Sequence, residues 1–266
     1  MKRISEIIRS YIAGVSLTII TLFFISCGTY SNDTDETDGF RDGILNEIRD
    51  LLSDDMISSI ENDLGMPIHR GAYPPDLDLF YGEEFTAGSL TVEKAPQLLH
   101  RSTVASDQGN NEPGTAWADR TFRFSNQDMQ NYTIRFETRA TRSDNEPVIS
   151  DRAFIIGQDN RFTIFAYVES EREEGVVKSI RIFSGILTDG GISEPYNSTF
   201  MIDNRGIRGI IPNGTGRSFV DGKGISLLAE WPAGKIAGKD FQNKPCECDE
   251  MYDQHWYGAG SENSGI

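Results

Sequence analysis

The chain is poor in cysteine, histidine and basic residues, and each shortage excludes a class of protein. Among 266 residues there are only three cysteines, which excludes a scaffold held together by many disulfides. Three histidines leave little material for a His-rich metal site. Lysine and arginine total 25 against 41 acidic residues, and the formal charge of −16 is the opposite of what binding to phosphates needs. We therefore expect a globular, acidic protein that does not bind nucleic acid.

Long apolar runs are also scarce, and the main one lies near the N-terminus. It extends from Tyr11 to Ile25 without a charged residue and follows the basic residues Lys2, Arg3 and Arg9. A membrane-spanning helix needs about 20 apolar residues, whereas the apolar core of a secretory signal is shorter. The run therefore has the size of a signal-peptide core, and a plain signal-anchor helix is the alternative.

Cys27 is the candidate lipidation site. The segment F-I-S-C-G at 24–28 resembles a bacterial lipobox, although Phe24 replaces the usual leucine. The resemblance implies that residues 1–26 are a lipoprotein signal peptide and that the Cys27 thiol takes the lipid. Several acyl chains on this residue would anchor the protein stably, where a single chain would not. Gly28 in place of aspartate resembles the outer-membrane address of Gram-negative lipoproteins.

Residues 27–39 combine the lipidated cysteine with an acidic tether. The stretch T-Y-S-N-D-T-D-E-T-D-G at 29–39 is polar and acidic, which is typical of a solvated spacer. Such tethers also resemble the surface-export signals of Bacteroidetes lipoproteins. We expect a protein anchored by lipid to the outer membrane, at its periplasmic face or at the cell surface.

Residues 40–75 predict an amphipathic helical segment and an irregular crossing. Apolar residues recur at helical spacing from 40 to 64: Phe40, Ile44, Ile48, Leu51, Leu52, Met56, Ile60 and Leu64. Ser53 and the two aspartates after it can divide this stretch into two short helices. Gly65 and Pro67 end it, and further prolines and glycines follow up to Pro75. We expect the helical segment to pack on the domain that follows.

Residues 76–232 predict a β-domain. Tyr132, Ile134 and Phe136 alternate with polar residues, which is the period of a strand with one buried face. The residues Gln158-Asp159-Asn160 predict a tight hairpin turn. Strand-like runs lie at 76–81, 89–99, 117–124, 132–137, 151–157, 161–169, 176–188, 192–203, 207–211, 215–220 and 225–231. About eight to ten strands with short connections predict an antiparallel up-and-down β-barrel of lipocalin-like or calycin-like type, with a β-sandwich as the alternative.

Aromatic residues are frequent on these strands. A barrel of eight strands can be filled by side chains or can hold one small ligand. The candidates for lining such a cavity are Phe122, Phe124, Tyr132, Phe136, Phe162 and Phe183. The sequence leaves both interpretations open, since the same residues would serve as an ordinary filled core.

The C-terminal extension, residues 233–266, contains Cys246 and Cys248. An exported protein meets an oxidising compartment, so a disulfide between them is the simplest prediction, with free or intermolecular thiols as the alternative. A metal site with His255, Asp249 and Asp253 has less support, because the spacing differs from that of structural zinc sites. We assign no metal and no cofactor.

Catalytic motifs are missing from the sequence. It has no G-x-S-x-G and no H-E-x-x-H, and His69 and His100 have no identifiable nucleophile partner. Paired carboxylates of a glycoside hydrolase could be present among the many acidic residues, but abundance does not select a pair. The question of enzyme activity stays open, the pattern favours a protein without it, and we assign no catalytic residue.

The order of several motifs resembles a family of Bacteroidetes lipoproteins of unknown function. The motifs are the lipobox, G-M-P-I-H-R-G-A-Y-P-P-D at 65–76, F-I-I-G-Q-D-N-R-F-T-I-F at 154–165, F-S-G at 183–185 and G-T-G-R-S-F-V-D-G-K-G at 214–224. The resemblance implies a lipocalin-like or avidin-like barrel at the cell envelope. It brings no catalytic residue with it.

Three functions are compatible with these patterns. The first is a lipid-anchored binding module for a small apolar or glycan ligand. The second is a structural or interaction lipoprotein with a filled barrel, whose polar loop at 106–115 contacts an envelope or host protein. The third is a polysaccharide hydrolase, which rests on analogy of habitat alone. We expect the binding module.

Overall fold

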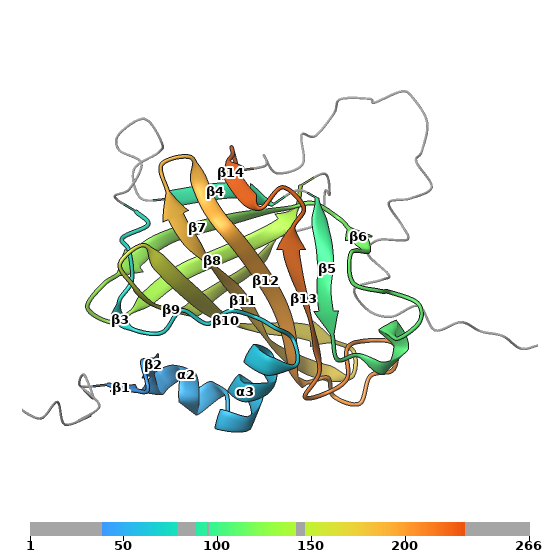
Figure 1. The fold of residues 1–266 in the computed structure, drawn as a ribbon. Coiled ribbons are helices and arrows are strands. Elements are labelled where there is room, and N and C mark those ends of the chain that lie inside the picture. Colours follow the sequence, from blue (N-terminus) through green and yellow to red (C-terminus); the bar gives the residue numbers. More distant parts are fainter. Residues whose placement is uncertain (1–38, 79–88, 95, 142–146, 232–266) are drawn as a thin grey trace, which may run out of the picture. The chain divides into compact units, whose positions relative to one another are not determined.

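The chain forms a helical segment and a large, almost entirely antiparallel β-sheet (Figure 1). A computed structural model describes residues 39–78, 89–94, 96–141 and 147–231. The helical segment consists of β1 (Phe40–Arg41), β2 (Ile44–Leu45), α2 (Asn46–Leu51) and α3 (Asp54–Asn62). Within the described residues the sheet has twelve strands: β3 (Ala72–Tyr73), β4 (Ser89–Lys94), β5 (Gln97–Ser102), β6 (Ala116–Trp117), β7 (Arg120–Asp128), β8 (Thr133–Ala140), β9 (Val148–Gln158), β10 (Arg161–Arg172), β11 (Gly175–Thr188), β12 (Gly191–Asp203), β13 (Gly216–Asp221) and β14 (Ile225–Leu228).

The prediction of a mainly antiparallel β-domain preceded by a helical segment is confirmed. The strands outnumber the expected eight to ten because predicted strands are interrupted. The predicted strand 89–99 breaks into β4 and β5 next to Pro96, which has no N–H to donate to a neighbouring strand. The predicted strand 117–124 is likewise divided between β6 and β7, whereas the turn at Asp221-Gly222-Lys223-Gly224 separates β13 from β14 as predicted.

Eight of the described strands pair with one another in a ring. The order is β4–β7–β8–β9–β10–β11–β12–β14, and β14 pairs again with β4. β13, β5 and β6 branch from the later part of β12, so the ring is not a regular barrel. The pairing of β4 with β7 nevertheless continues, beyond the break at Pro96, as the pairing of β5 with β6. Lys94 of β4 lies opposite Arg120 of β7, and Gln97 of β5 lies opposite Trp117 of β6.

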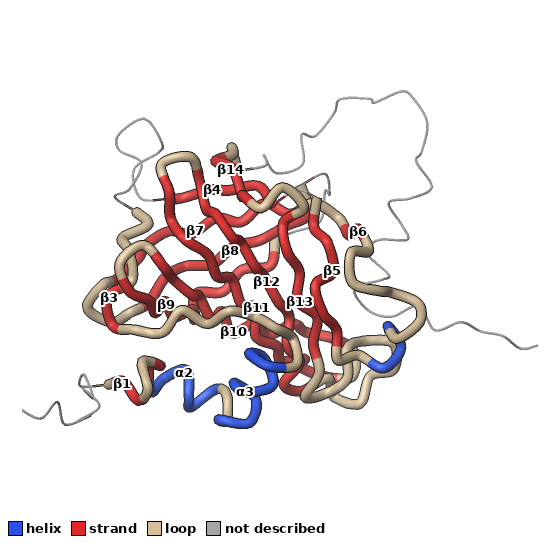
Figure 2. Tube along the Cα trace, in the orientation of Figure 1, coloured by secondary structure: helices blue, strands red, loops and turns tan. Residues whose placement is uncertain are grey.

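The two faces of the sheet bury different side chains. On β10, Phe165 belongs to one apolar cluster while Ile164 and Ala166 belong to another, as strand alternation requires. The first cluster also contains residues of α2 and α3, whose helices lie together beside the strands (Figure 2). We call the face that the helical segment covers the outer face, and the opposite face the inner face.

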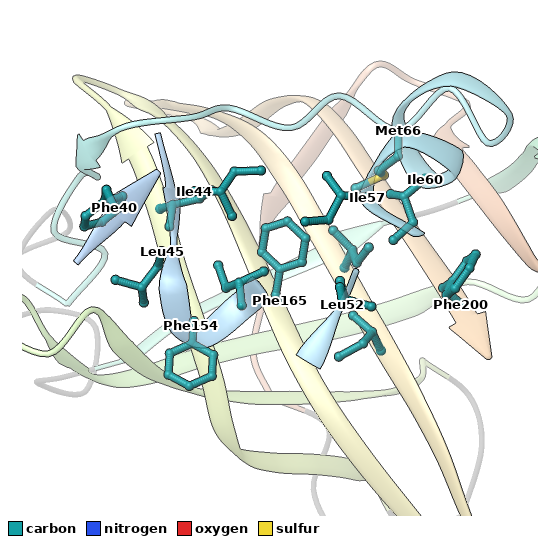
Figure 3. Close-up of a cluster of buried hydrophobic side chains, with 14 of the residues drawn as sticks. Phe40, Ile44, Leu45, Leu52, Ile57, Ile60, Met66, Phe154, Phe165 and Phe200 are labelled. Carbon is teal, nitrogen blue, oxygen red and sulfur yellow. The ribbon is translucent and has the colours of Figure 1, made fainter. Parts of the chain in front are cut away.

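The helical segment is held to the outer face by apolar contacts. Ile57 and Ile60 of α3 lie in one buried cluster with Phe165 and Phe200 of the sheet (Figure 3). The two helices are separate, as predicted, because Ser53 caps α3: its Oγ accepts a hydrogen bond from a backbone N–H in the first turn at 3.3 Å. The crossing then passes so close to β9 that a side chain does not fit at Gly71. A Cβ there would lie 2.5 Å from the Gly157 carbonyl oxygen.

Three local predictions were wrong or extend beyond the described residues. Residues 40–45 form a hairpin rather than helix, because Asp42 and Gly43 both have positive φ, as a tight hairpin turn requires. Residues 207–211 are turns and not a strand. They pack as a loop, with Ile211 buried beside Val104. Residues 76–78 are not a strand, and the rest of the predicted strand 76–81 lies outside the described residues.

Candidate functional site

Five of the six aromatic residues predicted to line a cavity come together on the inner face. Each is no more than 2% exposed, and their ring centroids lie 4.8–6.5 Å apart. They come from four strands, two pairs of consecutive ones: Phe122 and Phe124 from β7, Phe136 from β8, Phe162 from β10 and Phe183 from β11. We call these five residues the aromatic cluster. Their rings pack directly on one another, and their assignment as cavity lining stays a prediction.

Tyr132 lies elsewhere. It sits in the turn before β8 with a φ of 55°, and its ring packs edge-on against Phe40 at 4.8 Å. This contact belongs to the outer face. The alternation that groups Tyr132 with Ile134 and Phe136 therefore fails at the first of these residues, because the strand begins only at Thr133.

A fully buried lysine lies on the same face as the aromatic cluster. The cross-strand registers place Lys94 beside Arg120, and Phe183 beside Asn197, so these side chains share the inner face. Lys94 is 0% exposed. Its Nζ donates to Asn197 Oδ1 at 2.5 Å and to the Phe219 carbonyl oxygen at 2.7 Å. Burial holds the pKa of the Lys94 amine well below its ordinary value, and only the nearby Asp221 carboxylate opposes this shift.

A buried ion pair lies on the neighbouring part of the inner face. Arg217 of β13 binds Asp107 with both ends of its fork, Nε to Oδ2 at 2.6 Å and Nη2 to Oδ1 at 2.8 Å. Ser102 Oγ donates to Oδ2 at 2.6 Å, and Asn111 Nδ2 donates to Oδ1 at 3.2 Å. Burial raises the pKa of Asp107, but the hydrogen bonds from Arg217 and Ser102 outweigh this effect, so the pKa lies below its ordinary value.

An apolar wall joins the lysine to the ion pair. Leu99, Trp117 and Phe219 form a small buried cluster of their own. The Arg217 guanidinium lies 5.1 Å from the Trp117 ring centroid, and that ring contacts the ring of Phe219 at 5.3 Å. We call Lys94, Asn197, Asp221, Arg217 and Asp107 the inner polar site, with this wall as its apolar side.

No protein-family model, no curated protein and no solved structure matches the chain. The chemistry of the inner polar site is therefore inferred from its own residues. Two further basic groups lie on the inner face outside this site: Arg120 Nε donates to Thr138 Oγ1 at 3.1 Å, and Arg181 donates to Thr199. Basic groups beside an apolar wall are suited to a ligand with a negatively charged head and an apolar body.

The predicted cysteine sites fall outside the described residues. This applies to lipidation at Cys27 and to the disulfide between Cys246 and Cys248, so both stay predictions. In the part of the chain that the structure describes, no helix has the length and apolar content needed to cross a bilayer. The same residues hold no group of three His, Cys, Asp or Glu side chains that could bind a metal ion.

Sequence reasoning missed the inner polar site, although one signal for it was present. Leu90, Val92 and Lys94 occupy alternate positions of one strand, so a lysine follows two residues of a buried face. Likewise Arg217 stands two residues before Phe219. A cation in register with core residues indicates a buried charge, and a buried charge needs a partner.

Acid is expected to weaken this fold through two histidines. Burial lowers the pKa of His69, Arg161 adds to the shift and Glu194 opposes it. Burial and then Arg101 lower the pKa of His100. The unfolded chain therefore binds protons at a higher pH than the folded chain, and the free energy of unfolding falls as the pH drops below the ordinary value of 6.5. Urea denaturation between about pH 5 and pH 8 measures this slope. The slope should flatten in a His69→Gln/His100→Gln variant, and an unchanged slope would contradict this assignment.

Proposed function

We propose that this chain is a lipid-anchored protein of the outer membrane whose strand ring is an eight-stranded up-and-down barrel that binds a small ligand. The barrel is supported by the strand registers. β4 with β5, β6 with β7, and β13 with β14 each act as one bent strand, because their pairings run on across the breaks. Joined in this way, each strand pairs with its neighbours in sequence, and the last pairs with the first.

The single observation that carries ligand binding is the chemistry of the inner face. In a chain with a formal charge of −16, three basic side chains are buried there, namely Lys94, Arg120 and Arg217. Each of them donates to a group of the protein, Lys94 to Asn197, Arg120 to Thr138 and Arg217 to Asp107, so the head group of a ligand would exchange with such a partner. We propose that the ligand carries an acidic group, held by these basic side chains, and an apolar body that lies against the wall containing Trp117.

Native mass spectrometry of the protein released gently from its own envelopes tests this function. The expected result is a fraction of molecules that carry one additional small mass, which is lost on mild collisional activation. A matched Arg217→Met protein should carry less of it, while Arg205→Met, which removes an exposed arginine paired to Asp203, should carry the same amount. Protein of bare mass in every preparation would contradict the proposal.

A second candidate, an interaction protein with a filled ring, is favoured by the aromatic cluster. Its five rings leave at most 2% of any side chain exposed, so they fill that half of the inner face themselves. This candidate predicts a reproducible partner after cross-linking in intact envelopes, with cross-links on the exposed loop between β5 and β6. Cross-linking that yields no repeated partner would count against it.

The lipid anchor makes a separate prediction. Replacing Cys27 with serine should abolish incorporation of labelled palmitate and remove the mature protein from the membrane fraction, because the thiol that takes the diacylglycerol is gone. Cys246→Ser is the matched control and should keep both the label and the fractionation. Undiminished labelling of the Cys27→Ser protein would show that the lipid is elsewhere.

A further inference from the structure

Asp107 is a loop residue that reaches into the sheet. The loop between β5 and β6 includes the short 3-10 turn η1 (Ala105–Asp107). Between residues 105 and 114 the backbone runs over the surface, and Asp107 is the buried residue of that stretch, at 2% exposure. The Asp107 carboxylate binds this stretch to Arg217 of β13, and at its end the Gly114 N–H donates to the Leu99 carbonyl oxygen at 2.8 Å.

We propose that Arg217 and Ser102 form a binding site for the carboxylate of a small apolar acid, and that Asp107 occupies this site until the ligand displaces it. The inference deepens the proposed ligand-binding function and rests on it. Asp107 stands in for the head group of the ligand, and the loop that carries it closes the site.

The donors fit a planar carboxylate from outside the chain. Two guanidinium N–H groups of Arg217 point at the two carboxylate oxygens, and the hydroxyl of Ser102, the last residue of β5, donates to one of them. Asn111 donates to the other oxygen but lies on the same loop as Asp107, so it would leave with that loop. Bidentate arginine pairs of this kind are strong and geometrically selective. The carboxylate comes from the loop that follows β5, five residues after Ser102, which lies opposite Arg217 in the pairing of β5 with β13.

The apolar body of the acid has a surface beside this head-group position. Trp117 lies under the Arg217 guanidinium, and Leu99 and Phe219 extend the same apolar cluster. Phe219 also connects the site to Lys94, whose amine donates to the Phe219 backbone carbonyl. An alkyl chain lying against this wall would keep its apolar surface shielded from water.

Binding of octanoate and of 1-octanol, measured by calorimetry, tests the inference. The two probes share an alkyl chain and differ in charge. The protein is the mature chain carrying Cys27→Ser, which keeps every described residue. Octanoate should bind at least about tenfold more tightly than octanol, because only octanoate can use the Arg217 fork. Asp107→Asn should tighten octanoate binding by about tenfold or more, since the closed form no longer competes, and should leave octanol binding unchanged.

Two controls and one second measurement complete the test. Arg217→Met should abolish the preference for octanoate, and Arg205→Met should leave it intact. In the Asp107-containing protein, octanoate should also speed amide hydrogen exchange in residues 105–114 severalfold, because the loop is released. This measurement stands even if Asp107→Asn does not fold.

The outcomes separate the two levels of the proposal. If the Asp107-containing protein binds both probes equally, or binds octanoate with no faster exchange in the loop, the carboxylate site is wrong and ligand binding by the ring survives. If neither probe binds and the protein from envelopes carries no additional small mass, both the carboxylate site and the proposed ligand-binding function are wrong.

Discussion

Replacing Asp107 with alanine is expected to lower the free energy of unfolding by about 3–5 kcal/mol, because it leaves the Arg217 charge buried without its carboxylate. Both side chains are less than 5% exposed, so water cannot take over the lost hydrogen bonds unless the loop opens. Urea denaturation at neutral pH measures the loss. The Asp107→Ala/Arg217→Met double variant should be less destabilised than the sum of its single variants, since no unpaired charge remains.

Asp203→Ala is the matched control for this prediction. Asp203 also pairs with an arginine, Arg205, but the pair is exposed, with half of the arginine side chain open to solvent. Exposed pairs contribute about 0–1 kcal/mol, so this variant should stay close to the parent protein. Equal losses for the Asp107 and Asp203 variants would mean that the Asp107 pair is open to water in solution.

Phe124→Ala is expected to cost about 3–5 kcal/mol of unfolding free energy. Phe124 is 0% exposed, and its ring contacts those of Phe136, Phe162 and Phe183 at centroid distances of 5.9, 6.4 and 5.0 Å. The loss combines the transfer of the ring out of water with the void that it leaves between rigid neighbours. Chemical denaturation measures this loss as a shift of the midpoint at constant slope.

Met129→Ala is the corresponding control, because Met129 is 41% exposed, and a change within about 0.5 kcal/mol is expected there. The comparison also distinguishes the two interpretations of the aromatic cluster. Rings that fill the inner face give the large loss for Phe124→Ala. A loss below about 1 kcal/mol would instead indicate that Phe124 borders an open space, as a cavity-lining residue does.

The strand pattern of the domain follows from local sequence. Strands β8 to β12 show either a two-residue alternation or long apolar runs, and the turn at Asp159-Asn160 joins β9 to β10 as predicted. The division of the helical segment at Ser53 is local too, because the N-cap residue and the N–H that donates to it are only three residues apart. Fold class and most elements could therefore be predicted.

Features that depend on distant residues could not be predicted. The aromatic cluster contains strands whose relative position is set by the ring of pairings. Tyr132 does not belong to it, because its positive φ changes the face of the sheet on which its side chain lies.

The hairpin at Asp42-Gly43 had a recognisable turn signal, but the helical spacing of Phe40 and Ile44 led to the prediction of a helix. Here the local turn residues indicated the structure correctly, and the helical periodicity did not.

The inner polar site is the clearest example of a long-range feature. Lys94 and Asn197 are 103 residues apart, and Asp107 and Arg217 are 110 residues apart. Alternation can place Lys94 and Arg217 on a buried face, but it cannot say which groups meet them there. The contact of Asp107 with Arg217 could not be predicted from the sequence. An aspartate among serine, glycine and asparagine is typical of a surface turn.

A crystal structure of the protein grown with octanoate shows whether the inner face binds an acidic ligand in the place of Asp107. We expect octanoate with its carboxylate on the Arg217 fork, its chain along Trp117, and Asp107 turned out toward solvent. Crystals saturated with octanoate in which Asp107 remains on Arg217, and no ligand lies on the inner face, would contradict it.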